Sequence, residues 1–343
     1  MNLTELVGND QTKEQLIIAG KAAKSENRAL PHTLFGGPPG CGKTQFSRSL
    51  ASHFDVPFFQ IDASNLRSAE DLLPIVAEFS IDGYQIGGPQ HGHAVGPIQP
   101  PILFLDEVHN MPLKGQEHLG IAMENWKLAY TKKGGSKEVI WLPRFTVVGA
   151  TTITGKLSKP FRDRFKLQFR FKTYDGLESC KIVLLHARKM GVNLSVDSAK
   201  SIAARGRGVP RMLVRFLERA YDYAKVMGRL NEREGIPVDV VENMFASLEI
   251  SPRGLSGLDH LLLQCLYENR DVPVGLDSLA VLLDESQKTL SEEVEPFLIR
   301  TKFLVRTSRG RVLTEDGEKY VREQMGIKDD SSGCNLSKLI IKE

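Results

Sequence analysis

Apolar and polar residues follow two different periods along this chain. Short apolar runs of strand length occur at Thr33–Phe35, Val56–Asp62, Ile102–Leu105 and Thr146–Thr152. Apolar residues at helical spacing predict helices at Gln11–Lys24, Ala69–Phe79 and along the segment that contains Phe46, Leu50 and Phe54. Strands that alternate with helices are typical of an α/β fold. The sequence therefore predicts an α/β domain over residues 1–172.

The pattern becomes helical beyond this domain. Helices are predicted at Tyr174–Met190, Ser195–Arg205, Pro210–Met227 and Asp239–Leu248, in a helical domain over residues 173–250. The pattern over residues 251–325 predicts three short helices, Leu255–Glu268, Gly275–Leu283 and Thr289–Leu298. Two strands are predicted after them, at Phe303–Arg306 and Arg311–Thr314. This order is that of a winged helix. Residues 326–343 form a tail whose segment Asp329–Gly333 has linker composition.

A glycine-rich segment follows the first apolar run and has the pattern G-x-x-x-x-G-K-T from Gly37 to Thr44. Glycines let backbone N–H groups close around phosphate oxygens, and the next helix directs the positive end of its dipole at them. Lys43 would then contact the β- and γ-phosphates, and Thr44 would place its hydroxyl on Mg²⁺. The predicted ATP-binding residues of this segment are Gly37, Gly40, Cys41, Gly42, Lys43, Thr44 and Gln45. The alternative is a plain glycine turn between a strand and a helix.

The apolar run Ile102–Leu105 ends in two carboxylates. Asp106 is placed to hold the Mg²⁺ shell, and Glu107 can polarise the attacking water as a general base. The alternative is an acidic pair that caps the next helix.

Three further segments contain candidate polar groups. The strand Thr146–Thr152 ends in hydroxyls, which can orient the attacking water unless they are ordinary strand-end threonines. Arg162 and Arg164 can reach the γ-phosphate of a neighbouring subunit, or form a surface ion pair with Asp163. Arg211 follows Pro210 at a predicted helix start, where its charge can sense the state of a nucleotide.

Composition and charge narrow the interpretation further. The 343 residues are enough for two or three domains, and the net charge of +3 is too small by itself to indicate nucleic acid. We expect no membrane helix, since no window holds the roughly 20 apolar residues that one needs. Four scattered cysteines and an N-terminus without a signal-peptide pattern predict a reduced cytoplasmic protein without disulfides or zinc.

Positive charge is concentrated on the predicted C-terminal hairpin. Arg300, Lys302, Arg306, Arg309 and Arg311 form a run without an acidic residue between Glu295 and Glu315. A glycine at the tip and arginines on both arms favour contact with DNA phosphates without base reading. A solvated basic turn is the alternative.

The motifs occur in the order found in AAA+ ATPases, and among these the chain most resembles RuvB, the motor family of Holliday-junction branch migration. The motifs are Gly37–Thr44, Leu105–His109, Ala122–Glu124, Leu142–Thr146, Gly149–Thr152 and Arg162–Phe165. The resemblance extends from about Leu6 to about Lys319. It implies a three-layer αβα AAA+ P-loop domain, a helical lid and a C-terminal winged-helix domain that binds DNA. It also implies an ATP- and Mg²⁺-dependent motor that moves double-stranded DNA at four-way junctions through a homo-hexameric ring.

The same resemblance assigns roles to individual residues. Thr152 is the first candidate for sensor 1 and Thr151 the second, and Arg164 precedes Arg162 as the candidate arginine finger. Arg211 matches sensor 2, and Tyr174 matches a tyrosine near the base. The residues that match positions near the neighbouring nucleotide are Glu124, Asn125 and Trp126. Arg306 and Arg311 match DNA contacts, with Arg309 the next candidate.

The segment Lys127–Trp141 matches the family's hairpin before sensor 1, which docks on the junction-binding protein RuvA. Its arm Val139–Trp141 is apolar and suits a protein partner, whereas its tip carries Lys132, Lys133 and Lys137 and suits a phosphate backbone. The resemblance implies a protein of the cytoplasm, either of a bacterial cell or of a virus-infected bacterial host. Two other functions stay open: an AAA+ helicase loader or origin-binding ATP switch, and a DNA-binding scaffold whose nucleotide site is vestigial.

Overall fold

The computed structural model describes residues 2–75, 77, 100–131, 136–230 and 235–325. The sequence also predicts a surface loop over Ser80–Pro101, which is rich in Gly, Pro and His. Residues 80–99 of this loop lie outside the described ranges, as do the predicted hairpin tip at 132–135 and the tail at 326–343. Residues 1–218 form one compact unit and residues 219–343 a second. The domain boundaries near residues 172 and 250 stay a prediction.

The first unit is built on a five-stranded parallel sheet with the strand order β2–β3–β6–β1–β7. The strands are β1 (Thr33–Gly36), β2 (Phe58–Asp62), β3 (Ile102–Asp106), β6 (Thr146–Thr151) and β7 (Leu167–Arg170). β1 and β6 are buried along their whole length. Strands that are buried on both sides need helices on both faces of the sheet.

The helices of this unit are α1 (Asp10–Ser25), α2 (Lys43–Phe54), α4 (Leu113–Asn125), α5 (Lys159–Asp163), α6 (Gly176–Lys189), α7 (Val196–Arg205) and α8 (Pro210–Val226), which continues into the second unit. Its 3₁₀ turns are η1 (Leu3–Glu5), η2 (Ala63–Asn65), η3 (Glu70–Leu72), η4 (Val108–Asn110) and η5 (Thr154–Lys156).

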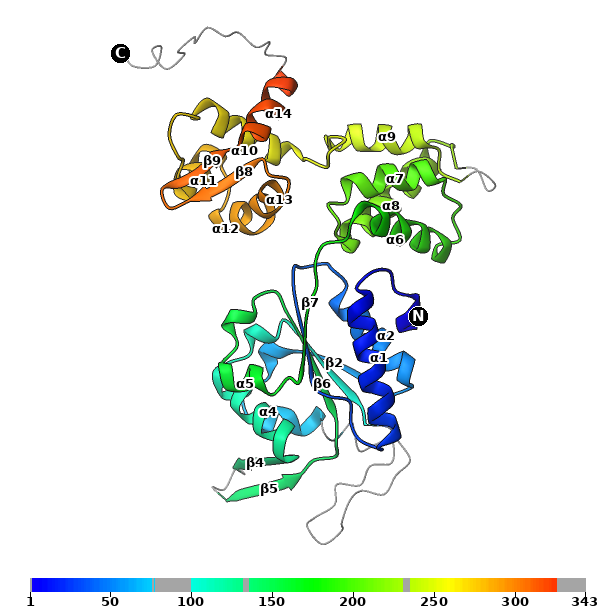
Figure 1. Cartoon of the computed structure of the whole chain (residues 1–343), viewed down its shortest axis with the longest axis vertical. Coiled ribbons are helices and arrows are strands. Elements are labelled where there is room, and N and C mark those ends of the chain that lie inside the picture. Colours follow the sequence, from blue (N-terminus) through cyan, green and yellow to red (C-terminus); the bar gives the residue numbers. More distant parts are fainter. Residues whose placement is uncertain (1, 76, 78–99, 132–135, 231–234, 326–343) are drawn as a thin grey trace. The chain divides into compact units, whose positions relative to one another are not determined.

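Two apolar clusters fill the space on either side of the sheet. Leu103 and Leu105 of β3 pack in one cluster with residues of α4 and α5. Ile102 and Phe104 point the other way and pack in the second cluster with residues of α1 and α2. α1 and α2 accordingly lie on one side of the sheet and α4 and α5 on the other (Figure 1). The predicted three-layer αβα architecture is confirmed.

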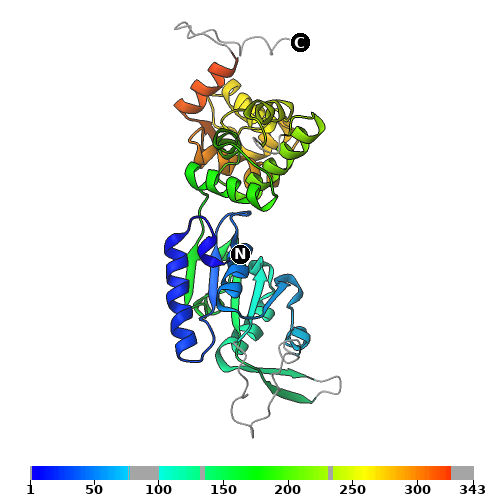
Figure 2. The same cartoon turned by 90° about the vertical axis from the view of Figure 1, so that its right-hand side faces the viewer.

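A separate hairpin joins α4 to β6. It consists of β4 (Lys127–Thr131) and β5 (Lys137–Trp141), which pair antiparallel with Lys127 opposite Trp141. It is not part of the main sheet, as Figure 2 shows. Leu128 anchors it in the core at 1% exposure, whereas Val139 is 60% exposed. The predicted hairpin is confirmed for the described residues.

Two of the predicted strand and helix ends are wrong. β6 ends at Thr151, one residue before the predicted end, so Thr152 lies beyond the strand. The helix predicted at Ala69–Phe79 begins as the 3₁₀ turn η3, and residues 73–75 and 77 are helical. Its predicted end lies outside the described residues.

The second unit contains α9 (Val238–Ser247), α10 (Gly257–Glu268), α11 (Leu276–Leu282), α12 (Gln287–Thr289), the π-helical turn η6 (Leu290–Val294), α13 (Glu295–Arg300), β8 (Leu304–Thr307), β9 (Gly310–Leu313) and α14 (Glu315–Met325). The order of α10 to β9 confirms the predicted winged helix. The third predicted helix is interrupted by η6 directly before Pro296, which has no N–H for a helical hydrogen bond.

α14 was not predicted from the sequence. Its first turn carries Glu315, Asp316 and Glu318, and the helix has few apolar residues, so the apolar pattern that marks it is short. The helix is held by tertiary packing, since Tyr320 and Val321 belong to the apolar core of this unit.

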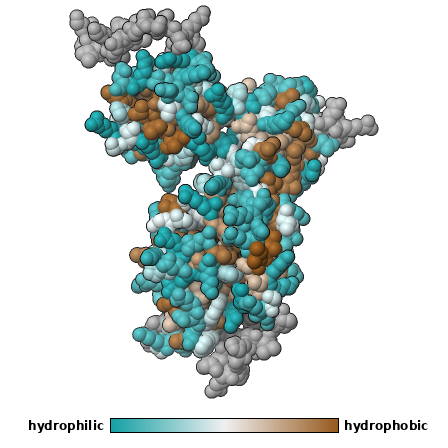
Figure 3. All heavy atoms as spheres, in the orientation of Figure 1, coloured by the Kyte–Doolittle hydropathy of each residue, from teal (hydrophilic) through white to brown (hydrophobic). Residues whose placement is uncertain are grey.

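Hydrophilic side chains cover most of the surface seen in Figure 3. Within the part of the chain that the structure describes, no helix is both long enough and apolar enough to cross a membrane.

A buried histidine gives the fold a predictable response to acid. His32 precedes β1 and is 8% exposed; its Nδ1 accepts a hydrogen bond from the Val147 N–H at 2.8 Å, and its Nε2 lies 3.2 Å from the Met123 carbonyl oxygen. A neutral ring protonated at Nε2 satisfies both contacts. Burial lowers the pKa of His32 to about 4. The contribution of neutral His32 to the stability of the fold is therefore complete above the ordinary histidine pKa of 6.5, and it is lost as the pH falls toward 4.

We expect protonation linked to His32 to lower the free energy of unfolding by about 3 kcal/mol when the pH is lowered from 7 to 4. The variant His32→Gln keeps an acceptor and a donor but has no titrating proton. Denaturant unfolding at both pH values should show a smaller acid loss for this variant than for the wild type. An equal loss in both proteins would contradict the assignment.

Candidate nucleotide site and nucleic-acid surface

The loop between β1 and α2 has a backbone that glycine favours. Gly37, Gly40 and Gly42 have φ values of 146°, 74° and 89°. A Cβ at Gly37 would lie 2.5 Å from the Phe171 carbonyl oxygen, which is closer than real Cβ contacts. The glycines thus let the chain turn tightly into the N-terminus of α2, where N–H groups and the helix dipole favour an anion.

Lys43 is the first residue of α2 and is 7% exposed. Its Nζ donates to the carbonyl oxygens of Gly37 at 2.8 Å and Pro38 at 2.9 Å. Burial lowers the pKa of Lys43, and the nearby carboxylates of Glu107 and Asp106 oppose that shift. The ammonium group is therefore held over the loop, close to the two carboxylates.

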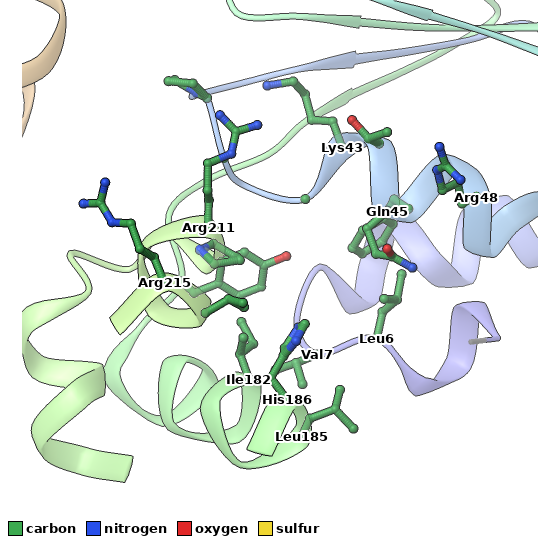
Figure 4. Close-up of a pocket in the computed structure, with 18 of the residues that line it drawn as sticks. Leu6, Val7, Lys43, Gln45, Arg48, Ile182, Leu185, His186, Arg211 and Arg215 are labelled. Carbon is green, nitrogen blue, oxygen red and sulfur yellow. The ribbon is translucent and has the colours of Figure 1, made fainter. Parts of the chain in front are cut away.

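A cavity of about 630 Å³ opens beside the loop. The part of its lining next to the phosphate loop is polar and consists of Gly40, Gly42, Lys43, Thr44, Gln45, Asp106, Glu107 and Arg211. Arg48, His186, Arg215 and Glu218 are further polar residues of the lining. Its apolar lining comes from the segment before α1 and from α6, and Figure 4 shows Leu6, Val7, Ile182 and Leu185 gathered on the side away from Lys43. A polar end and an apolar end suit the phosphates and the base of a nucleotide.

Tyr174 connects three segments around this cavity. Its buried hydroxyl accepts a hydrogen bond from Asn9 Nδ2 at 3.1 Å and donates to the Cys41 carbonyl oxygen at 3.3 Å. The backbone N–H of Tyr174 donates to the Gly208 carbonyl oxygen at 2.8 Å. Burial raises the pKa of Tyr174 to about 12. The tyrosine thus joins the N-terminal segment and the phosphate loop to the turn before α8.

The start of α8 meets the phosphate loop directly. The N–H of Arg211 donates to the Gly40 carbonyl oxygen at 3.3 Å. A Cβ at Gly40 would lie 3.1 Å from the Arg211 Cβ. This close approach places Arg211 on the cavity wall beside Lys43, where its charge also lowers the pKa of that lysine.

The two carboxylates at the end of β3 differ in their surroundings. Asp106 lines the cavity, and its Oδ1 accepts a hydrogen bond from the Glu107 N–H at 3.0 Å. Glu107 has left-handed backbone angles, with φ at 44°, at the N-cap position of η4. Its side chain makes no capping hydrogen bond. Its Oε2 instead lies 3.3 Å from Thr152 Oγ1 and 3.0 Å from His109 Nδ1, so the capping alternative is wrong for Glu107.

Thr44 and Asp106 supply oxygen atoms on the same cavity wall. Magnesium prefers oxygen ligands and is usually bound by one or two carboxylates together with substrate phosphates. Among the described residues, no group of three or more His, Cys, Asp or Glu side chains could hold a metal ion. The donors present therefore fit a Mg²⁺ ion that is shared with the phosphates of a nucleotide.

A second group of predicted site residues lies outside the cavity lining. Arg164 follows α5, and one guanidinium nitrogen donates to Glu124 Oε2 at 3.0 Å while another donates to the Pro160 carbonyl oxygen at 2.7 Å. The Arg164 side chain is 20% exposed. A side chain at Gly120 would meet Arg164 at 3.0 Å. Arg164 thus pairs with Glu124. The alternative, an ion pair between Arg164 and Asp163, is wrong.

The residues after Glu124 differ in exposure. Asn125 is exposed at the end of α4. Trp126 packs edge-on against Phe145, with ring centroids 5.6 Å apart, and stacks at a tilt on His32. Trp126 therefore has a packing function in the core in addition to any role at a nucleotide.

The arginines of the wing share one buried partner. Arg306 and Arg311 lie opposite each other in β8 and β9. Glu295 of α13 is fully buried. Its carboxylate accepts a hydrogen bond from Arg306 Nε and another, at 2.7 Å, from Arg311 Nε. The Arg311 side chain is 16% exposed and that of Arg306 46%. Arg309 is exposed at the turn between the strands.

Three residues at these sites were not predicted: Asn9, His109 and Glu295. Asn9 lies in none of the motifs of the sequence, and His109 occurs only at the end of the motif Leu105–His109. Glu295 is next to Pro296 in an otherwise apolar helical turn, and an acid at such a position is a signal of a buried pair. Asn9 meets Tyr174, which is 165 residues away, and His109 meets Thr151, which is 42 residues away, so local spacing does not identify these contacts.

Three family models match consecutive parts of the chain. Residues 33–173 match the ATPase family associated with various cellular activities (AAA). Residues 174–251 match the RuvB AAA lid domain, and residues 252–322 match the RuvB C-terminal winged helix domain.

Individual proteins are similar over nearly the whole chain. The Holliday junction branch migration complex subunit RuvB of Prochlorococcus marinus (strain MIT 9515) is 34% identical, covering 92% of this chain and 85% of that protein. The subunit of the same name from Paramagnetospirillum magneticum (strain ATCC 700264 / AMB-1) is 36% identical, covering 93% and 87%. The structure of the Thermotoga maritima RuvB Holliday junction branch migration motor superposes with a TM-score of 0.73 at 31% identity, covering 92% of this chain and 95% of that one.

Proposed function

The chain belongs to the RuvB family of AAA+ ATPases, and from this premise we propose that it uses ATP hydrolysis to drive branch migration of Holliday junctions. The similar proteins named above are subunits of branch migration complexes. The observation that carries the proposal is the contact between Thr152 and Glu107 beside the phosphate loop, because it joins a candidate water-orienting group to a candidate base.

The residues around the cavity divide the chemistry among them. Lys43 contacts the β- and γ-phosphates, and Thr44 and Asp106 hold Mg²⁺, which when bound neutralises charge on the phosphate oxygens. Glu107 accepts a proton from the attacking water, and Thr152, with Thr151 as the second candidate, orients that water. Arg211 senses the nucleotide from the start of α8, while Tyr174 shapes the base end of the cavity.

We place the rest of the site on a neighbouring subunit. Arg164, Glu124, Asn125 and Trp126 do not line the cavity of their own chain. An arginine that has no role at its own nucleotide can complete the site of the next subunit in a ring. Arg164 is the proposed finger, with Arg162 the second candidate, and the ring is a homo-hexamer as in the family.

The wing is the proposed contact with double-stranded DNA. Arg306, Arg309 and Arg311 lie on one short hairpin, and Glu295 holds two of them in fixed positions. Guanidinium groups on a hairpin suit phosphates, which are the same in every sequence. The wing therefore follows the backbone and does not read bases.

We propose that the hairpin β4–β5 binds a protein of the RuvA type. Val139 is 60% and Trp141 38% exposed, so the hairpin presents apolar surface. Lys127 Nζ lies 3.9 Å from the Trp141 ring centroid and holds the indole by a cation–π contact. Exposed aromatic and aliphatic side chains of this kind are typical of protein interfaces.

We expect the chain to dissociate a synthetic four-way junction in an ATP-dependent manner when a RuvA-type partner is present. Glu107→Gln should bind ATP and form rings but fail to turn it over, since it lacks the base. Lys43→Ala should lose ATP binding with the fold intact by thermal melting. ATP turnover without movement of the junction would contradict the proposal and favour a helicase loader.

Arg164→Ala should lower ATP turnover by about 10³-fold or more, because arginine fingers contribute at least that factor in GTPases. Lys43→Ala should be inactive for a different reason, since it affects the subunit that binds the nucleotide. Mixed rings of the two variants should regain part of the activity at interfaces where an intact Lys43 faces an intact Arg164. Lys166→Ala, an exposed cation nearby, serves as the matched control. Absence of recovery in mixed rings would place Arg164 outside the shared site.

Arg306→Ala, Arg309→Ala and Arg311→Ala should each lower the salt slope of DNA binding by about 1, equally for different sequences. The three variants should differ in stability. Arg309→Ala should unfold like the wild type, whereas Arg311→Ala should lose about 3 kcal/mol because it removes a partner of the buried Glu295. Lys319→Ala on α14 is the control for loss of one exposed charge. Unchanged slopes in all three variants would remove the wing from the DNA interface.

A further inference from the structure

His109 lies between two strand ends of the nucleotide site. It belongs to η4, directly after the carboxylates of β3, and its side chain is 8% exposed. Its Nδ1 lies 3.0 Å from Glu107 Oε2 and 3.0 Å from Thr151 Oγ1. One ring nitrogen thus contacts both the candidate base and the last residue of β6.

The neighbours of this nitrogen determine where its proton must be. A carboxylate can only accept a hydrogen bond, so Glu107 Oε2 needs a donor. Thr151 Oγ1 accepts from the Ile153 N–H at 3.0 Å and, as a hydroxyl, can either donate to Nδ1 or accept from it, so the carboxylate decides the position of the proton. Burial lowers the pKa of His109, with Glu107 opposing the shift and Lys156 and Lys43 adding to it, so the ring is neutral at pH 7 and carries one proton. That proton belongs on Nδ1.

The two oxygens of Glu107 are not equivalent. Oε2 faces His109 Nδ1 at 3.0 Å and Thr152 Oγ1 at 3.3 Å. Both contacts are made by the same oxygen, and Glu107 lines the cavity, so Oε1 is the oxygen available to a substrate there. A general base works in this way when a neighbouring group fixes one of its atoms and the other faces the substrate.

We propose that His109 is a positioning residue for the general base: its Nδ1–H holds Oε2 of Glu107 and turns Oε1 toward the attacking water. This inference rests on the proposed role of Glu107 and adds the group that orients it. Glu107 follows the last residue of β3 and has left-handed backbone angles, so strand pairing does not fix the direction of its side chain.

Two amide variants distinguish the ring nitrogens. The amide nitrogen of Asn lies near the position of Nδ1, whereas that of Gln lies near Nε2. We expect His109→Asn to keep DNA-stimulated ATP turnover within about 3-fold of the wild type, and His109→Gln and His109→Ala to lower kcat by about 10-fold or more with KM changed less than about 2-fold. His118→Gln on α4 is the matched control histidine. Equal activity of all His109 variants, or equal loss in all of them, would overturn the proposal.

Further variants separate this inference from the proposed function. If Glu107→Gln turned over ATP at the wild-type rate, the role of Glu107 itself would be wrong. If Glu107→Gln is inactive while His109→Gln and His109→Ala are fully active, only the role of His109 is wrong. In single-turnover measurements, adding His109→Ala to Glu107→Gln should cause no further loss, because His109 acts through the carboxylate. Thermal melting and binding of a fluorescent ATP analogue identify variants that fail to fold.

The position of the proton can be measured without any activity. Nitrogen NMR of the chain with isotope-labelled histidine distinguishes the two neutral tautomers, and the His109 signal is the one missing in His109→Asn. We expect the Nδ1–H form at pH 7. The Nε2–H form would overturn the proposal, since Nδ1 would then have no hydrogen to donate to Glu107.

Discussion

The order of three parallel strands determines where the site forms. β6 lies between β3 and β1, with Gly149 opposite Leu105 on one side and Thr151 opposite Gly36 on the other. Parallel strands end at one edge of the sheet, so the β6 hydroxyls come between the carboxylates and the phosphate loop. The Gly37 N–H donates to the Thr151 carbonyl oxygen at 3.1 Å and fixes the start of the loop against β6. Without this order, Thr152 could not meet Glu107, and His109, which follows Glu107 by two residues, could not meet Thr151.

Much of the fold follows from local pattern, but much of the site does not. Short segments of the sequence predict the phosphate loop, the strand that ends in carboxylates, the lid helices and the order of the winged helix. The structure has these elements. The contact between Glu107 and Thr152 is different, because it depends on a strand order that no local pattern specifies and on a left-handed turn at a non-glycine residue. In the sequence Glu295 is only an acid beside the basic run, whereas burial makes it the partner of two arginines. α14 has few apolar residues, and those few pack in the core of its unit.

The pair of Arg164 and Glu124 shows how a finger can be held before it is used. The Arg164 guanidinium is mostly buried and bonded within its own chain, and Gly120 leaves room for it. An exposed free arginine would lose more side-chain entropy on entering a neighbour's site. A guanidinium that is already oriented loses less side-chain entropy. A phosphate can replace Glu124 as its partner, because carboxylates and phosphates both offer oxygen atoms to the N–H groups of a guanidinium. In the proposed ring, Glu124 therefore lowers the entropic cost of forming the shared site.

The buried carboxylate under the wing affects how strongly one subunit can hold DNA. Arg306 and Arg311 together with Glu295 have a net charge of only +1, and Arg309 adds one more positive charge without a partner of that kind. Each phosphate contact changes the logarithm of affinity by about 0.9 per logarithmic unit of salt, so under the proposed contact with DNA a single wing holds a duplex weakly at physiological salt. In the proposed ring, several wings around one duplex raise the effective concentration for each other and hold the DNA together. Weak contacts in each subunit and strong contacts in the ring suit a motor, because each wing must release the backbone and bind it again while the others hold.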